Sequence, residues 1–156
     1  MKIYTSYFYQ VRFFKENMVP ISTAMYDPKW YHDYHNQTYV FKDKRGIING
    51  IKIQAFIPGI ECQDLCGGPD KCDTGDPNTC KFLTTYKKQL DSLNHKKVIK
   101  YLYDVVKATG VKKPVVVLLF HETPDKQCSE RTAVQKWFKS HGDHVEELQY
   151  PINEHY

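Results

Sequence analysis

Residues 115–120 read VVVLLF, an unbroken run of six apolar side chains that is followed by the polar stretch HETPDKQC. A continuous apolar, β-branched run of this length is typical of a strand that is buried on both faces. Such strands lie in the centre of parallel sheets, whose two faces are covered by helices. The run therefore predicts an α/β fold built around a central parallel strand.

Two more strands are predicted near the N-terminus, at Lys2–Phe8 and Val19–Ala24, with a short helix at Gln10–Asn17 between them. A strand–helix–strand unit returns the chain to the same edge of the sheet, so the two strands are expected to be parallel. Val145–Leu148 can add a last strand. The stretch Thr38–Phe56 is interrupted by glycines and fits no single element.

Three helices complete the pattern. The first begins at Lys81, with its apolar residues at helical spacing at Phe82, Leu83, Tyr86, Leu90 and Leu93. Asn94 is expected to cap the second helix and Gly110 to end it, and the third spans Ser129–Ser140. We therefore expect a single three-layer α/β domain over residues 1–156, with a mainly parallel sheet and a cysteine-rich loop inserted at residues 62–80.

The short lengths of the apolar runs predict that the chain does not span a membrane. No apolar run of the 156 residues approaches the roughly 20 needed to span a bilayer. The start, MKIYTSYFYQVRFFKEN, lacks the layout of a secretory signal peptide. A cytoplasmic location and no membrane partner are expected, and disulfides are rare in that compartment.

Four of the five cysteines lie together in CQDLCGGPDKCDTGDPNTC, at Cys62, Cys66, Cys72 and Cys80. Four thiolates match the tetrahedral ligand set of structural zinc, and the intervening glycines and prolines allow tight turns. The spacing is not that of two C-x2-C knuckles, so an iron–sulfur cluster, disulfides and unliganded thiols remain alternatives. A zinc site closed by four protein ligands stabilises a loop and performs no catalysis.

Polar residues follow the predicted strands, at the edge where open parallel sheets bind ligands. Thr5, Ser6 and Tyr7 end the first strand and are predicted to bind substrate. Glu122 follows the central strand, while Cys128 and Arg131 stand at the start of the third helix, where backbone N–H groups can hold an anion. These last three are the predicted catalytic residues.

Each of these residues also has a structural interpretation. Glu122 can be a solvated loop acid or a helix cap, Cys128 a small buried filler, and Arg131 an ion-pair partner of Glu130 or Glu122. The histidine pairs His32/His35 and His141/His144 have the short spacing of metal ligands, but loop histidines more often face solvent. No Walker loop, dinucleotide fingerprint or nucleophile elbow is present.

Nine lysines crowd residues 81–113, opposed there by only two acids, Asp91 and Asp104. Such a surface can bind phosphate groups, although it is more often the solvated side of helices. The nine are Lys81, Lys87, Lys88, Lys96, Lys97, Lys100, Lys107, Lys112 and Lys113. Nucleic acid therefore enters as an alternative partner.

Several segments carry a resemblance to a known family. The chain resembles domain-of-unknown-function family 488 in four segments: IYTSYF, the Pro20-Ile21-Ser22 segment, FLTTYKKQL and VVVLLFHETPDKQCSERTAVQKWF. The best motif of that family is a strand ending in L-L-C-x-E, followed by C-H-R and by a helix ending in W-L or W-F. Here Phe120 replaces the strand's cysteine, and C-H-R is written C-S-E-R without the histidine. The resemblance implies an α/β fold and a site at Glu122, Cys128 and Arg131.

Two functions follow as hypotheses. The first is a small enzyme, a hydrolase or transferase acting on a nucleotide, nucleoside or modified base at the strand ends, with Glu122 as general base or nucleophile and Arg131 binding an anionic group. The alternative is a module that binds nucleic acid or protein through the lysine-rich helices and the metal loop.

Overall fold

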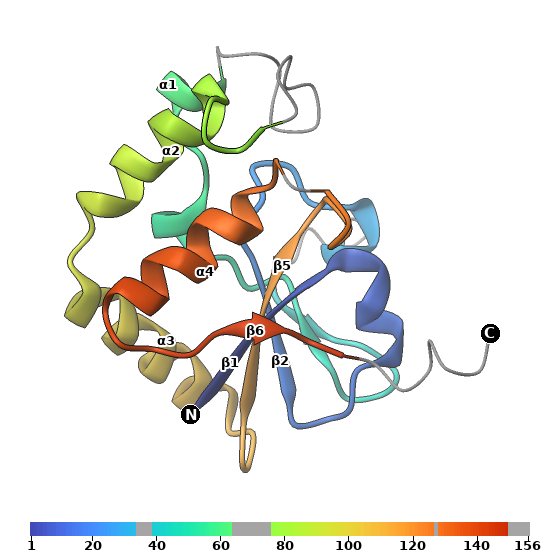
Figure 1. Cartoon of the computed structure of the whole chain (residues 1–156). Helices are drawn as coiled ribbons and strands as arrows, with labels where there is room; N and C mark the ends of the chain where they lie inside the picture. The colour runs from blue at the N-terminus through green and yellow to red at the C-terminus, as the bar shows by residue number, and fades with distance from the viewer. Residues whose placement is uncertain (34–38, 64–75, 127, 150–156) are drawn as a thin grey trace.

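The computed structural model describes residues 1–33, 39–63, 76–126 and 128–149. Its main sheet has four strands in the order β2-β5-β1-β6, and every neighbouring pair is parallel. The strands are β1 (Lys2–Tyr7), β2 (Met18–Ser22), β5 (Val115–Phe120) and β6 (Glu146–Glu147). The predicted α/β fold with a mainly parallel sheet is confirmed, and β5 is a central strand as the VVVLLF run indicated (Figure 1).

Both faces of β5 are buried, each against a different part of the chain. Val116, Leu118 and Phe120 belong to a core shared with the helices, whereas Val117 and Leu119 belong to a second core. Successive side chains of a strand point to opposite faces, which accounts for this division. A strand covered on both sides needs no polar alternation, and this explains its sequence.

The helices of the first core begin and end close to where the sequence placed them. Asn94 accepts a hydrogen bond from the Lys97 N–H at 3.1 Å and so caps α3, and Gly110 ends that helix in the left-handed conformation. The Ser129 side chain caps α4. The α-helices are α1 (Ile60–Gln63), α2 (Lys81–Asp91), α3 (His95–Thr109) and α4 (Glu130–Ser140).

The connection between β1 and β2 differs from the prediction of an α-helix at Gln10–Asn17. The chain forms a 3-10 helix, η1 (Phe8–Phe13), instead. Phe8, Val11 and Phe14 are buried in the second core, and this spacing of three residues is the period of a 3-10 helix. The two strands are parallel as expected, but they are not neighbours, because β5 lies between them.

Residues 38–56, for which the sequence predicted no single element, form short elements where the structure describes them. β3 (Phe41–Lys42) and β4 (Ile48–Asn49) make an antiparallel pair, and the 3-10 turn η3 (Gln54–Phe56) follows them. Another 3-10 turn, η2 (Lys29–Tyr31), precedes this stretch. An isolated bridge joins Ser22 to Lys52, so this stretch runs along the outer side of β2.

β2 is an edge strand of the main sheet and carries Pro20, which has no N–H for a ladder bond. Toward the outside, the Ser22 N–H donates to Ile51 O at 2.8 Å and the Ile53 N–H donates to Ser22 O at 3.0 Å. The Tyr31 hydroxyl lies 3.0 Å from Pro20 O.

Within the described ranges, no helix is long and apolar enough to cross a membrane.

Candidate functional site

The carboxyl ends of β1, β2 and β5 lie at one edge of the main sheet because the three strands are parallel. Tyr7, Ser22 and Phe120 are the last residues of these strands. α4 begins shortly after β5, so its first turn is also placed at this edge (Figure 1). Open α/β sheets bind ligands at this edge, and the polar contacts found there define the candidate site.

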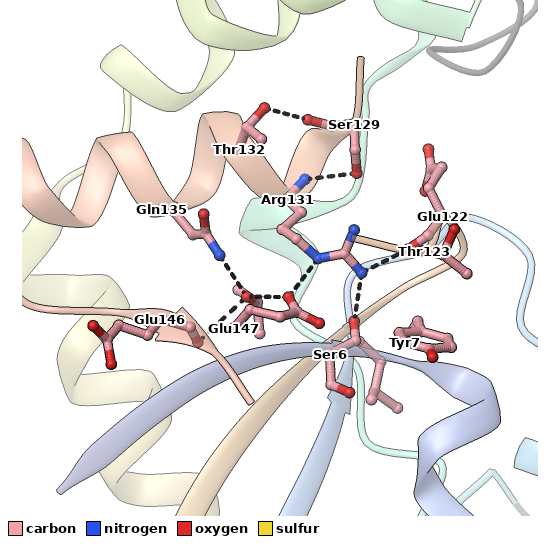
Figure 2. A network of polar contacts seen from close by, with 12 residues as sticks. Ser6, Tyr7, Glu122, Thr123, Ser129, Arg131, Thr132, Gln135, Glu146 and Glu147 are labelled. Atoms are coloured by element: carbon pink, nitrogen blue, oxygen red, sulfur yellow. Dashed lines mark hydrogen bonds and ion pairs between the residues drawn. The ribbon is translucent and has the colours of Figure 1, made fainter. Parts of the chain in front are cut away.

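Arg131, in the first turn of α4, connects the ends of two strands. Its side chain is buried, and its Nη2 donates to Ser6 O at 3.2 Å and to Glu122 O at 2.6 Å (Figure 2). Its backbone N–H donates to the Ser129 side chain at 3.1 Å, which fixes the turn from which the guanidinium projects. Arg131 therefore ties β1, β5 and α4 together.

The same guanidinium forms an ion pair with a residue of β6. Arg131 Nε lies 2.7 Å from Glu147 Oε1, and the two side chains are only 4% and 16% exposed. The Thr5 hydroxyl donates to Glu147 Oε1 at 2.8 Å, and Gln135 Nε2 donates to the Thr5 hydroxyl at 2.7 Å. Burial raises the pKa of Glu147 above its ordinary value, and Arg131 and Thr5 offset only part of that effect.

Some of the hydrogen-bonding capacity of this network is unused. A guanidinium has five N–H groups, and the two of Arg131 Nη2 donate to Ser6 O and Glu122 O. Among the described residues, Arg131 Nε and Nη1, Ser6 Oγ and Glu147 Oε2 are buried without a well-directed hydrogen bond, so the short contact between Nε and Glu147 Oε1 is an ion pair. Figure 2 places Nη1 on the side of the guanidinium away from Ser6.

The three predicted catalytic residues do not form one constellation of side chains. Glu122 contributes its backbone carbonyl to Arg131, while its side chain points away from the guanidinium (Figure 2). Cys128 is buried in the core shared with the helices. Arg131 is the member that the structure places at the centre of the polar network.

The three predicted substrate-binding residues differ in exposure. Thr5 and Ser6 are fully buried, and Thr5 contacts Glu147 and Gln135 as described above. Tyr7 is half-buried, and its hydroxyl accepts a hydrogen bond from Gln10 Nε2 at 2.7 Å. Tyr7 therefore presents the most surface of the three.

Glu147 and Gln135 were missed by the sequence reasoning. Gln135 lies one helical turn beyond Arg131 on α4, and residues four apart share a helix face, so its position was accessible to a pattern argument. Glu147 belongs to a two-residue strand whose pairing with Thr5 depends on the folded sheet. Its position had no signal in the local sequence.

A second polar cluster lies beside the end of β2. The Asp27 side chain is fully buried, and its Oδ2 lies 3.0 Å from His32 Nε2 and 3.3 Å from Lys52 Nζ. The Ser22 hydroxyl donates to Asp27 Oδ1. Burial, with the neighbouring Asp27 charge, raises the pKa of the Tyr31 hydroxyl well above its ordinary value. Asp27 and Lys52 had not been singled out from the sequence.

The histidines do not form a metal site within the described ranges, where no group of three or more metal-ligating side chains occurs. His32 binds Asp27, and His35 lies outside the described residues. The His141 ring stacks on His95 with centroids 4.4 Å apart, and His144 pairs with Glu146.

The predicted metal loop is described only at its two ends. Cys62 in α1 and Cys80 before α2 are both buried in the core shared with the helices, and Cys66 and Cys72 lie outside the described residues. No disulfide joins any two of the described cysteines. Burial raises the pKa of the Cys62 thiol, and the charges of Glu61 and Glu130 add to that effect.

The nine lysines of residues 81–113 are all exposed. Lys87 pairs with Asp91 at 2.9 Å and Lys100 with Asp104 at 2.6 Å, in both cases between residues four apart on one helix. Exposed pairs of this kind contribute little to stability. The lysines are therefore accessible to solvent.

Comparisons with known proteins do not identify a relative. No protein-family model matches the chain, no curated protein matches it, and no solved structure matches it.

Proposed function

We propose that the protein is a small enzyme, a hydrolase or transferase, that acts on a nucleotide, nucleoside or modified base at the carboxyl edge of its main sheet. One observation carries this proposal: a buried arginine lies 2.7 Å from a carboxyl group of raised pKa at that edge. Carboxyl groups with perturbed pKa values next to a defined charge partner are concentrated at functional sites.

Arg131 and the first turn of α4 have the chemistry to bind the anionic part of such a substrate. Nη1 retains two N–H groups without partners among the described residues, and a helix N-terminus favours negative charge. Because Nη1 is buried, the groups that cover it must move to admit a ligand. Tyr7, half-buried at the end of β1, can contribute one wall.

Two carboxyl groups are candidates for the acid–base role. Glu147 touches Arg131 and has a raised pKa, which brings its titration closer to neutral pH, as acid–base catalysis requires. Glu122, the residue indicated by the sequence, directs its side chain away from Arg131. We therefore propose Glu147 for this role and keep Glu122 as the alternative.

The test begins with the wild-type protein and a panel of nucleotides, nucleosides and modified bases, with products followed by mass spectrometry. On any substrate that is turned over, Glu147→Gln should lower kcat/KM by about 100-fold or more. Glu146→Gln is the matched control, because it removes the same charge from the exposed neighbouring residue. A panel without any turnover would end the proposal, and a loss confined to Glu122→Gln would assign the role to Glu122.

We also propose that the loop of Cys62, Cys66, Cys72 and Cys80 binds one structural zinc ion. Support comes from the two described thiols, which the fold brings into the same buried core although they are 18 positions apart in the sequence. A zinc ion held by four thiolates leaves no open position for substrate, so its contribution would be to stability.

The second candidate function, binding of nucleic acid or protein, is favoured by the exposure of all nine lysines. A labelled single-stranded oligonucleotide tests it by fluorescence anisotropy. Replacement of Lys96, Lys97 and Lys100 by Gln should weaken the binding and flatten its salt dependence, because fewer phosphate contacts are made. Unchanged affinity in the triple variant would reject this function.

A further inference from the structure

A groove of about 630 Å³ lies between α3 and the segment that carries β4, at a distance in sequence from the Arg131 network. We call it the α3 groove, and its main lining residues are His32, Tyr39, Ile51, Lys52, Tyr101 and Val105. Its volume falls within the range of about 300–1,000 Å³ that small-molecule sites occupy.

The walls of the α3 groove are mostly apolar. Ile48, Ile51 and Val105 line it, and Val40 contributes a side chain that is largely exposed. Tyr39 and Tyr101, which are 70% and 41% exposed, present aromatic rings at its rim. Apolar and aromatic surface left open to water at a concave place favours a ligand with an apolar body.

One end of the groove is polar and held in a fixed geometry. The fully buried carboxylate of Asp27 binds both His32 and Lys52, which line the groove. The Tyr101 hydroxyl donates to Lys52 O at 2.7 Å, which fixes the Lys52 backbone against α3. This end is therefore organised before any ligand arrives.

The polar end offers a donor to a ligand. An ammonium group has three N–H donors. Lys52 Nζ donates to Met25 O at 3.2 Å and lies 3.3 Å from Asp27 Oδ2 in an ion pair, so it keeps the capacity to donate to a ligand. The groove lining contains Lys52 and His32 but no Asp or Glu. The Asp27 carboxylate lies 3.3 Å from Lys52 Nζ, but it is fully buried and paired with both residues, so an anionic ligand would meet the cationic groups and not this carboxylate.

From this combination we propose that the α3 groove binds a small amphiphilic anion, whose apolar body packs on Ile51 and Val105 and whose anionic group accepts a hydrogen bond from Lys52. The ligand class is an aromatic or short aliphatic carboxylate or sulfonate. This site is separate from the Arg131 network, and it does not depend on the proposed enzymatic function.

The probe for this site is 1-anilinonaphthalene-8-sulfonate, an aromatic sulfonate whose fluorescence rises in apolar surroundings. The folded wild-type protein should bind one molecule with a dissociation constant in the micromolar range. Octanoate should displace it, whereas octylammonium should not, because only the former offers an acceptor to Lys52. Displacement by both ions to the same extent would overturn the anionic part of the proposal.

Two variants locate the site. Val105→Glu, which places a carboxylate in the groove, should abolish binding, and Tyr103→Glu should not, because Tyr103 lies on α3 outside the groove lining and the charge change is the same. Lys52→Met should weaken binding about tenfold, the usual worth of a hydrogen bond to a charged group. Equal binding by wild type and Val105→Glu would overturn the proposal.

A measurement on the unaltered protein removes any doubt about the folding of the variants. In two-dimensional ¹⁵N–¹H NMR spectra, addition of the probe should shift the amide signals of Gly50, Ile51, Val105 and Thr109, which line the groove. Shifts confined to other parts of the protein, or no shifts, would reject the site.

Discussion

The backbones of Gly50 and Tyr39 cross in direct contact, so that a Cβ atom on Gly50 would lie 1.5 Å from the Tyr39 carbonyl oxygen. Gly50 also has a φ of +95°, a conformation that residues with a side chain rarely adopt. Only glycine fits at this crossing. Because Tyr39 and Gly50 both line the α3 groove, the contact also sets the shape of that groove.

Gly50→Ala should therefore destabilise the fold by more than about 3 kcal/mol, because the Tyr39 segment must move to make room. Gly142→Ala is the matched control: Gly142 has a φ of +86° and nothing within 4 Å of an added Cβ. Its cost should be about 1 kcal/mol, from the backbone conformation alone. Urea unfolding measures both, and equal costs would contradict the crossing.

Arg131→Met should lower the free energy of unfolding by about 3–5 kcal/mol, because it leaves the Glu147 carboxylate buried without its partner. Glu147→Gln removes the other half of the pair. In urea unfolding, the double variant should cost at least about 1 kcal/mol less than the sum of the single variants. Strict additivity would show that the two side chains do not stabilise each other.

The contribution of Glu147 to the free energy of unfolding should decrease as the pH rises above about 4.5, the ordinary pKa of a glutamate side chain. The folded chain keeps a proton on this carboxyl at pH values where the unfolded chain has lost it, so folding takes up a proton and a rising pH opposes it. The free energy of unfolding of wild type minus that of Glu147→Gln should decrease across this range. Chemical unfolding at several pH values between about 4 and 8 measures it.

The control for this pH dependence is Glu146→Gln, which changes an exposed carboxyl on the same strand. That variant should follow the wild-type pH profile. A difference between wild type and Glu147→Gln that stays constant with pH would mean that burial does not raise the pKa of Glu147.

Protein purified without chelator should contain about one zinc ion per chain by inductively coupled plasma mass spectrometry, since four thiolates fill a tetrahedral site. Cys62→Ser should lose the metal and lower thermal stability. Cys128→Ser is the control, because this cysteine lies outside the loop of residues 62–80, and it should retain the metal. A zinc content near zero in the wild type would reject the site, and iron with sulfide would favour the cluster alternative.

Elements with local signals were predictable from the sequence. The buried strand Val115–Phe120 is indicated by its apolar composition. α3 is bounded by Asn94, which caps it with a side-chain hydrogen bond, and by Gly110, which ends it in the left-handed conformation. The position of Arg131 at the strand ends followed from the alternation of strands and helices alone.

The contacts of Arg131 were less predictable. The sequence suggested an ion pair with Glu130 or Glu122, whereas the partner is Glu147, 16 residues further along the chain. That pairing depends on β6 adding to β1 beside Thr5, and a two-residue strand has too few residues to show a period. The crossing of Tyr39 and Gly50 likewise arises from tertiary packing, and neither residue indicates the other in sequence.

The outer edge of β2 has a consequence for how molecules of this protein meet at high concentration. Four of its outward-facing backbone groups are already engaged: the Met18 N–H with Lys15 O, the Pro20 carbonyl with the Tyr31 hydroxyl, and both backbone groups of Ser22 with residues 51 and 53. Pro20 itself offers no N–H to a newcomer. A strand from another molecule therefore finds no continuous ladder to pair with along β2, and this border of the sheet is protected against the edge-to-edge association that leads to aggregates.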